Sequence, residues 1–130
     1  MTKYRFMTFT LLLACLLWPV SSSVSLAEKP AVVFFSHIYD LPLPPKMQEL
    51  VEEAVIFDNP TGRVVESVAI GPNSKNNIIA FYQSSLPQLG WHSADQVGLI
   101  YQRGGEKITL RIETRHNDRR ILFMTLTPVK

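Results

Sequence analysis

Three histidines are each followed within three positions by an aspartate, and these pairs are the side chains best suited to chemistry. A neutral imidazole beside a carboxylate can ligate zinc or act as a general base. Each pair lies in a turn-like stretch, and the sequence has no HExxH, CxxC or GxSxG spacing. A metal site would require at least two pairs to converge in the fold. The pairs are His37 with Asp40, His92 with Asp95, and His116 with Asp118.

The sequence therefore assigns no catalytic residue, metal ligand or cofactor. A small hydrolase or metal-dependent enzyme built on the His/Asp pairs stands as an alternative function.

A second group of side chains is basic and could bind rather than react. Clustered guanidinium groups hold phosphate or carboxylate groups bidentately, so an anionic envelope component or an acidic envelope protein would suit them. The alternative is a solvated turn in which Glu113 and Asp118 act as local counterions. The four arginines are Arg111, Arg115, Arg119 and Arg120.

The first residues of the chain have the pattern of a secretory signal peptide. Lys3 and Arg5 precede an apolar run over 6–20, and Ser25 and Ala27 form a small-x-small cleavage site. We expect cleavage after Ala27 and an exported protein, periplasmic or extracellular. The apolar run is shorter than the roughly 20 residues that a spanning helix needs, so an uncleaved anchor is the less favoured alternative.

Cys15 is the only cysteine and offers a second way to stay at the membrane. The residues around it resemble a lipoprotein acylation site. Leu13 is a poor fit to such a site, however, and the apolar run continues past Cys15 to Val20. Without the leader, the chain has no cysteine, and so no disulfide or thiol chemistry.

The net charge of the chain is +2, and Lys3 and Arg5 account for it. The mature chain, residues 28–130, is therefore neutral and gives no electrostatic basis for binding nucleic acid.

The mature chain divides into an extended proline-containing segment over 28–54 and an α+β domain over 55–130. Pro42, Pro44 and Pro45 favour extended geometry, either as a strap laid on the domain or as a ligand for an aromatic groove. Helical spacing over 47–54 indicates a short amphipathic helix at the end of this segment.

One helix of the domain carries strong start and stop signals. Ser74 can cap it, and Pro87 removes a helical hydrogen bond. Gly90 can adopt the left-handed conformation that closes a helix, which places Trp91 over the helix end as a core plug. The apolar stripe of this helix includes Ile78, Phe81, Tyr82 and Leu86.

Five strands are expected around this helix. A turn through Pro60 and Gly62 joins strands at 55–57 and 63–70 into a hairpin, and strands follow at 97–103, 107–114 and 121–127. The clean alternation over 107–114 is typical of an antiparallel sheet with one covered face. The order ββαβββ predicts an α+β fold, a single two-layer domain with one main helix on one face of an antiparallel sheet of about five strands.

Four phrases between Asp40 and Pro128 resemble a family of short exported bacterial proteins of unassigned function. They are DLPLPPKMQE, VIFDNPTGRVVESVAIG, FYQSSLPQLGW and YQRGGEKITLRIE. The strand–helix–LGW–strand segment is also similar in topology to BamC-like envelope lipoprotein modules. The resemblance implies an envelope location and no catalytic residue.

These observations predict a non-enzymatic exported protein, a binding or accessory module of the cell envelope. A purely structural envelope protein is a further alternative.

Overall fold

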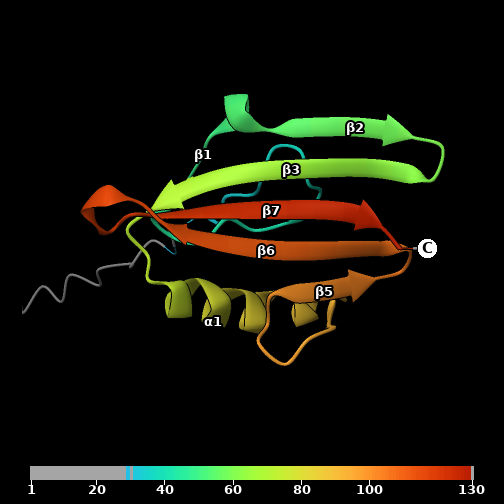
Figure 1. The fold of residues 1–130 in the computed structure, drawn as a ribbon. Helices are drawn as coiled ribbons and strands as arrows, with labels where there is room; N and C mark the ends of the chain where they lie inside the picture. Colours follow the sequence, from blue (N-terminus) through green and yellow to red (C-terminus); the bar gives the residue numbers. More distant parts are fainter. Residues whose placement is uncertain (1–28, 30, 130) are drawn as a thin grey trace, which may run out of the picture.

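The computed structural model describes residue 29 and residues 31–129 of the chain. The predicted leader, with Cys15 and the cleavage position Ala27, lies outside the described residues. The described part is a single α+β domain, as predicted: one open antiparallel sheet carries one main helix on one face (Figure 1). Within the described part, no helix is both long and apolar enough to cross a membrane.

The sheet has seven strands rather than the predicted five. The two additional strands, β1 and β4, are two residues long and too short to leave a periodic signal in the sequence. The elements are β1 (Gln48–Glu49), a 3₁₀ turn (Val51–Glu53), β2 (Val55–Asn59), β3 (Gly62–Gly71), α1 (Lys75–Ser85), a 3₁₀ turn (Pro87–Leu89), β4 (His92–Ser93), β5 (Ile100–Arg103), β6 (Glu106–Thr114), a 3₁₀ turn (His116–Asp118) and β7 (Arg120–Pro128).

The strands lie in the order β1-β3-β7-β6-β5-β4, and β2 pairs with the same side of β3 as β1 does. The three longest strands, β3, β7 and β6, therefore lie next to one another inside the sheet. β3 and β7 form seven residue pairs, from Val65–Leu126 to Gly71–Arg120. The predicted hairpin of β2 and β3 is confirmed, and Gly62, at φ 133°, follows its turn. A Cβ at Gly62 would lie 3.1 Å from the Pro128 side chain, so this position also favours glycine.

The prediction of a helix over 47–54 is wrong. Gln48 and Glu49 pair with Ile70 and Ala69 of β3, and only the single 3₁₀ turn follows. An isolated helix of eight residues is marginal, whereas the exposed backbone of β3 offers ladder hydrogen bonds at this point. Lys46 begins the departure from helical geometry with a φ of 67°.

β5 begins at Ile100, three residues later than predicted. The carboxylate of Asp95 accepts hydrogen bonds from the N–H groups of Gly98, Leu99 and Ile100, at 3.0, 3.1 and 3.2 Å. These bonds hold the backbone in a turn, so the β-branched Val97 is 55% exposed instead of lying in a strand.

Helix α1 begins and ends where its signals predict. The Ser74 hydroxyl accepts from the Asn77 N–H at 3.2 Å, which satisfies one free donor of the first turn. The helix ends at Ser85, Pro87 opens the following 3₁₀ turn, and Gly90 closes it in the left-handed conformation at φ 83°.

The N-terminal segment forms half of the second layer. Its apolar side chains join those of α1 in one core against the inner face of the sheet, and Leu41 and Leu43 are buried as a strap would require. Gly71 permits the close approach, because a Cβ there would lie 2.7 Å from Met47 Cγ. The core residues of this segment are Phe35, Ile38, Leu41, Leu43 and Met47.

Candidate functional site

The corner that follows α1 brings the helix stop and the tryptophan together. Trp91 is 1% exposed, and its backbone N–H donates to the carbonyl of Leu86 at 3.1 Å. Phe81 and Tyr82 pack edge to face, with ring centroids 5.1 Å apart. The Tyr82 hydroxyl donates to the Pro42 carbonyl at 3.0 Å, and burial raises its pKa well above the ordinary value. Trp91 and the rings of α1 are therefore structural residues of the core.

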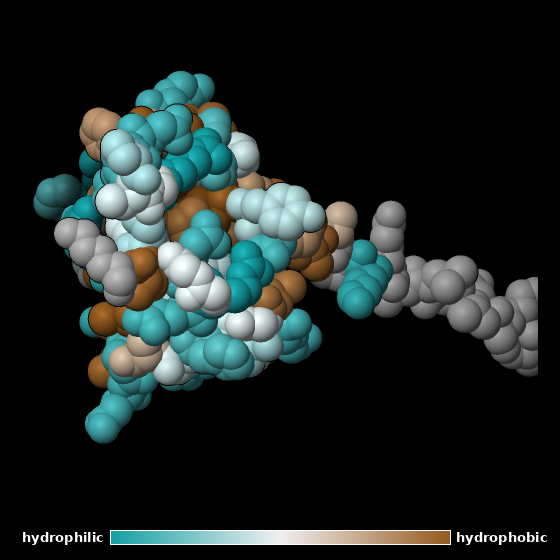
Figure 2. Space-filling model, turned by 90° about the vertical axis from the view of Figure 1, so that its right-hand side faces the viewer, coloured by the Kyte–Doolittle hydropathy of each residue, from teal (hydrophilic) through white to brown (hydrophobic). Residues whose placement is uncertain are grey.

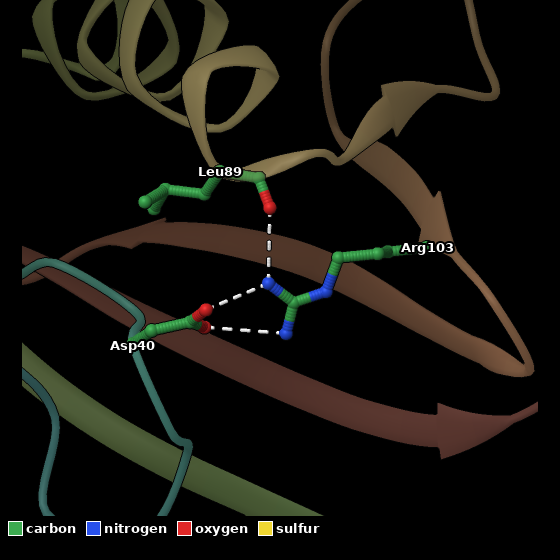
Figure 3. Close-up of polar contacts among 3 residues, drawn as sticks. All are labelled: Asp40, Leu89 and Arg103. Carbon is green, nitrogen blue, oxygen red and sulfur yellow. Dashed lines mark hydrogen bonds and ion pairs between the residues drawn. The ribbon is translucent and has the colours of Figure 1, made fainter.

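Arg103 binds this corner to the N-terminal segment. Its Nη1 and Nη2 donate to the two oxygens of Asp40 at 2.7 and 3.2 Å, and Nη1 also reaches the Leu89 carbonyl at 3.0 Å (Figure 3). The guanidinium carbon lies 4.3 Å from the centre of the Trp91 ring. Both charged side chains are 28% exposed, so this ion pair is sheltered and bidentate. We call Asp40 and Arg103 the clasp.

The clasp is a residue pair that sequence reasoning missed. Asp40 and Arg103 are separated by 63 positions and stand in two different phrases of the sequence, so no local pattern links them. Sequence reasoning paired Asp40 with His37, its neighbour along the chain, instead.

The His/Asp pairs do not converge on a metal site in the part of the chain that the structure describes. No three His, Cys, Asp or Glu side chains there are grouped closely enough to hold a metal ion. Asp40 is bound by Arg103, and Asp95 is bound by backbone N–H groups. His116 and Asp118 lie exposed in the turn between β6 and β7.

The environment of Asp95 favours its charged form. Partial burial raises the pKa of this carboxyl, but hydrogen bonds from the N–H groups of Leu99, Ile100 and Gly98 outweigh it, so the net pKa is lowered. A carboxylate held ionised in this way is a poor general base at neutral pH. Its geometry is that of a turn anchor.

The structure does not gather the four arginines into one cluster. Arg111 forms an ion pair with Glu113 and stacks over the Phe123 ring, with 3.6 Å between its guanidinium carbon and the ring centre. Arg120 faces the opposite side of the sheet from Arg111, because side chains alternate along the ladder. Arg115 and Arg119 are exposed at the β6–β7 turn. We call Arg115, Arg119 and Arg120 the basic hairpin.

Two open apolar hollows lie on either side of Phe34. One, of about 270 Å³, lies between the N-terminal segment and α1, and the other, of about 370 Å³, is bordered by Tyr39 and Asp40. Figure 2, which views the end of the sheet where β2 finishes, also shows apolar surface gathered in a central hollow ringed by hydrophilic side chains. Tyr39 and Asp40 are the ionisable side chains that border the second hollow, and Arg103 already binds Asp40. None of the described residues that line the first hollow is ionisable.

The outer strand β2 exposes the longest run of apolar side chains in the sheet. Val55, Ile56 and Phe57 are 42, 38 and 62% exposed. Among the described residues, β2 pairs only with β3, so its other side is open (Figure 1). We call the open side of Val55–Asn59 the β2 edge. The sequence identified a strand here but carried no signal that it would be an outer one.

The fold and these surfaces define a small α+β domain with an open sheet edge. No protein family model, no curated protein and no solved structure matches the chain.

Proposed function

We propose that this protein is a non-enzymatic exported module of the cell envelope that binds another envelope protein. The observation that carries the proposal is the β2 edge, where three large apolar side chains lie exposed beside open backbone. Isolated apolar side chains are ordinary on a protein surface, but a contiguous row on an open strand is a typical interaction site.

The state of the polar side chains supports binding rather than catalysis. Two of the three aspartates that could assist a histidine already hold structural partners, Arg103 for Asp40 and backbone N–H groups for Asp95. Catalysis by a His/Asp pair needs a carboxylate free to orient the imidazole or a substrate.

The leader of the sequence supports the cellular location. Mass spectrometry of the protein recovered from cells should show a chain that starts at Glu28. A diacylglyceryl mass on Cys15 would place the protein at the membrane as a lipoprotein, and an uncleaved chain recovered from the cytoplasm would contradict export.

Site-specific photocrosslinking in cells tests the binding function. Benzoylphenylalanine is placed at Phe57 on the β2 edge and, as a matched control, at Tyr39, an aromatic residue that is 88% exposed elsewhere. A discrete adduct with another envelope protein from position 57 and none from position 39 is the expected result. Adducts of equal yield from both positions, or none from position 57, would contradict the proposal.

The basic hairpin favours a second candidate, an anionic envelope component. Within residues 29 and 31–129, Arg115, Arg119 and Arg120 have no carboxylate within ion-pair distance. The mature protein should then bind vesicles containing phosphatidylglycerol weakly at low salt. Exposed pairs are screened as the Debye length falls from about 10 Å at 0.1 M to about 3 Å at 1 M.

Changing all three arginines of the basic hairpin to serine should abolish vesicle binding, while Arg111→Ser serves as the control. Binding that survives the triple change, or that ignores salt, would exclude this candidate.

A further inference from the structure

The two edges of the sheet are built differently. On one side the sheet ends in β4, two polar residues long, His92 and Ser93. On the other side it ends in β2, five residues long and exposed throughout. Natural sheets usually shorten, charge or cover their edges, because an open strand is a template for another strand. The β4 side follows that rule and the β2 side does not.

The backbone of β2 has hydrogen-bonding capacity to spare. β2 is antiparallel to β3 over five registered pairs, from Val55–Glu66 to Asn59–Gly62. In such a ladder, the N–H and C=O groups of alternate residues point away from the paired strand. With β3 on one side and open space on the other, these groups form a row that an added strand could pair with.

Side chains extend this row on both faces of the sheet. Val55 and Phe57 lie opposite Glu66 and Val64 on the outer face, and Ile56 lies opposite the fully buried Val65 on the core side. An incoming strand with apolar residues at alternate positions would therefore find apolar neighbours on whichever face those residues occupy. Burial of these side chains gives the affinity, and the backbone pairing gives the geometry.

The charges around the β2 edge are mainly acidic and favour a basic binding partner. Glu52 and Glu53 precede β2, and Asp58 lies within it, all of them exposed. Arg63 approaches Asp58 only at 4.0 Å, and these two side chains are 49 and 85% exposed, so the pair neutralises little.

A second copy of the chain would suit this edge poorly. Antiparallel self-pairing centred on Ile56 would set Glu53 of one copy opposite Asn59 of the other and therefore next to its Asp58. Like charges on neighbouring positions of paired strands repel each other. A strand with basic residues at its ends would instead meet opposite charge at both ends of β2.

We propose that the β2 edge binds a partner protein by strand addition, and that the bound segment is extended, apolar at alternate positions, and flanked by lysine or arginine. The inference rests on the proposed binding function and specifies the partner segment. Strand addition to an open sheet edge is a common mode of peptide recognition, with the main chain supplying affinity and alternate side chains supplying specificity.

A set of short peptides provides the test. The probe is a fluorescein-labelled peptide of sequence KVTVTVK, and its controls are EVTVTVE and a KVTVTVK peptide N-methylated at alternate amides. We expect the mature protein to bind the probe with a dissociation constant below about 1 mM, and each control at least about tenfold more weakly. Hydrogen exchange at the amides of β2 should slow when the probe binds.

Charge reversal on the protein sharpens the test. The triple variant Glu52→Lys, Glu53→Lys and Asp58→Lys should prefer EVTVTVE to KVTVTVK. The control Glu106→Lys, an exposed reversal at the β5–β6 turn, should leave the original preference intact. All four side chains are exposed, so these variants should fold.

Several results would overturn strand addition. They are equal binding of the N-methylated peptide, no binding of KVTVTVK at about 1 mM, unchanged exchange in β2, or an unaltered preference in the triple variant. Sedimentation equilibrium could instead show a dimer that Phe57→Lys disrupts. That result would mean that the β2 edge binds a second copy of the chain and not a partner protein.

These outcomes are separable from those of the crosslinking experiment. An adduct at position 57 together with an N-methyl-insensitive peptide would retain the binding function and reject strand addition. The absence of any adduct at position 57 would reject the binding function itself.

Discussion

Two buried tyrosines allow the value of a single hydrogen bond in this core to be measured. Tyr82 is fully buried, and its hydroxyl donates to the buried Pro42 carbonyl at 3.0 Å. Tyr101 is 1% exposed, and its buried hydroxyl has no hydrogen-bond partner among the described residues. Substitution by phenylalanine removes the hydroxyl group from either tyrosine and leaves a ring that is buried to a similar extent. Only Tyr82→Phe leaves a partner behind.

The expected effects of the two substitutions differ in size. Tyr82→Phe leaves the Pro42 carbonyl buried without a donor, which costs about 1–3 kcal/mol of the free energy of unfolding. Tyr101→Phe removes an unpaired buried hydroxyl, so the free energy of unfolding should stay equal to wild type or rise. Because the carbonyl belongs to the N-terminal segment, the difference also measures how firmly that segment is held to α1.

Urea unfolding of residues 28–130, followed by the fluorescence of Trp91, measures both effects. Trp91 is the only tryptophan of that chain. With an m value of about 1–2 kcal/mol/M for a domain of this size, Tyr82→Phe should lower the midpoint by about 1 M. Equal losses in the two variants, or no loss in Tyr82→Phe, would refute the assignment of this hydrogen bond.

The same residue predicts how stability depends on alkaline pH. Burial raises the pKa of Tyr82 above the ordinary value near 10. Its contribution to stability is therefore complete below pH of about 10 and is lost as the pH rises toward the folded-state pKa, because the unfolded chain ionises first. The wild type should lose stability above pH of about 10 more steeply than Tyr82→Phe. Parallel profiles would contradict this reasoning.

Three further predictions concern the corner and its turn. Trp91→Ala should lower the free energy of unfolding by about 3–5 kcal/mol, because it empties a buried site, and a urea midpoint equal to wild type would contradict core placement. Arg103→Met should lower the free energy of unfolding by about 1–3 kcal/mol, because the variant loses the charged hydrogen bonds to Asp40. A double-mutant cycle with Asp40→Asn should show a positive coupling energy between the two residues. Additive losses would mean that Asp40 and Arg103 do not stabilise the fold as a pair. Asp95→Asn should be less stable than wild type at neutral pH. Because the pKa of Asp95 is lowered, its contribution is present above pH of about 4 and is lost on acidification, so the two proteins should converge in acid, and a constant difference would refute the role of the charge.

Local signals predicted the parts of the fold that local physics determines. The Ser74 cap, the Pro87 break and the left-handed Gly90 each act within a few residues, and each is where the sequence placed it. The alternation of β6 also predicted a sheet with one covered face, and Ile108 and Leu110 lie buried on that face.

The features that sequence reasoning missed depend on contacts between distant segments. The 63-residue separation between Asp40 and Arg103 leaves no periodic trace. Residues 47–54 have helical spacing, but Gln48 and Glu49 pair with β3 instead of forming a helix. β3 lies outside the short stretch of sequence from which the helix was predicted, so that stretch could not indicate the pairing. Sequence reasoning named Glu113 as a local counterion of the four arginines, but it did not show that Glu113 pairs with Arg111 in particular. For the same reason, it did not show that β2 is an outer strand.

The position of β7 in the sheet governs when the domain can assemble. β7 is the last strand along the described chain, yet it lies between β3 and β6 and holds the two halves of the sheet together. The pairing of Val65 with Leu126 must close a long loop, a slow step that no earlier strand can replace. A chain still emerging from the ribosome therefore lacks the centre of its own sheet. The sheet can therefore be completed only after β7 has been synthesised and has paired with both β3 and β6.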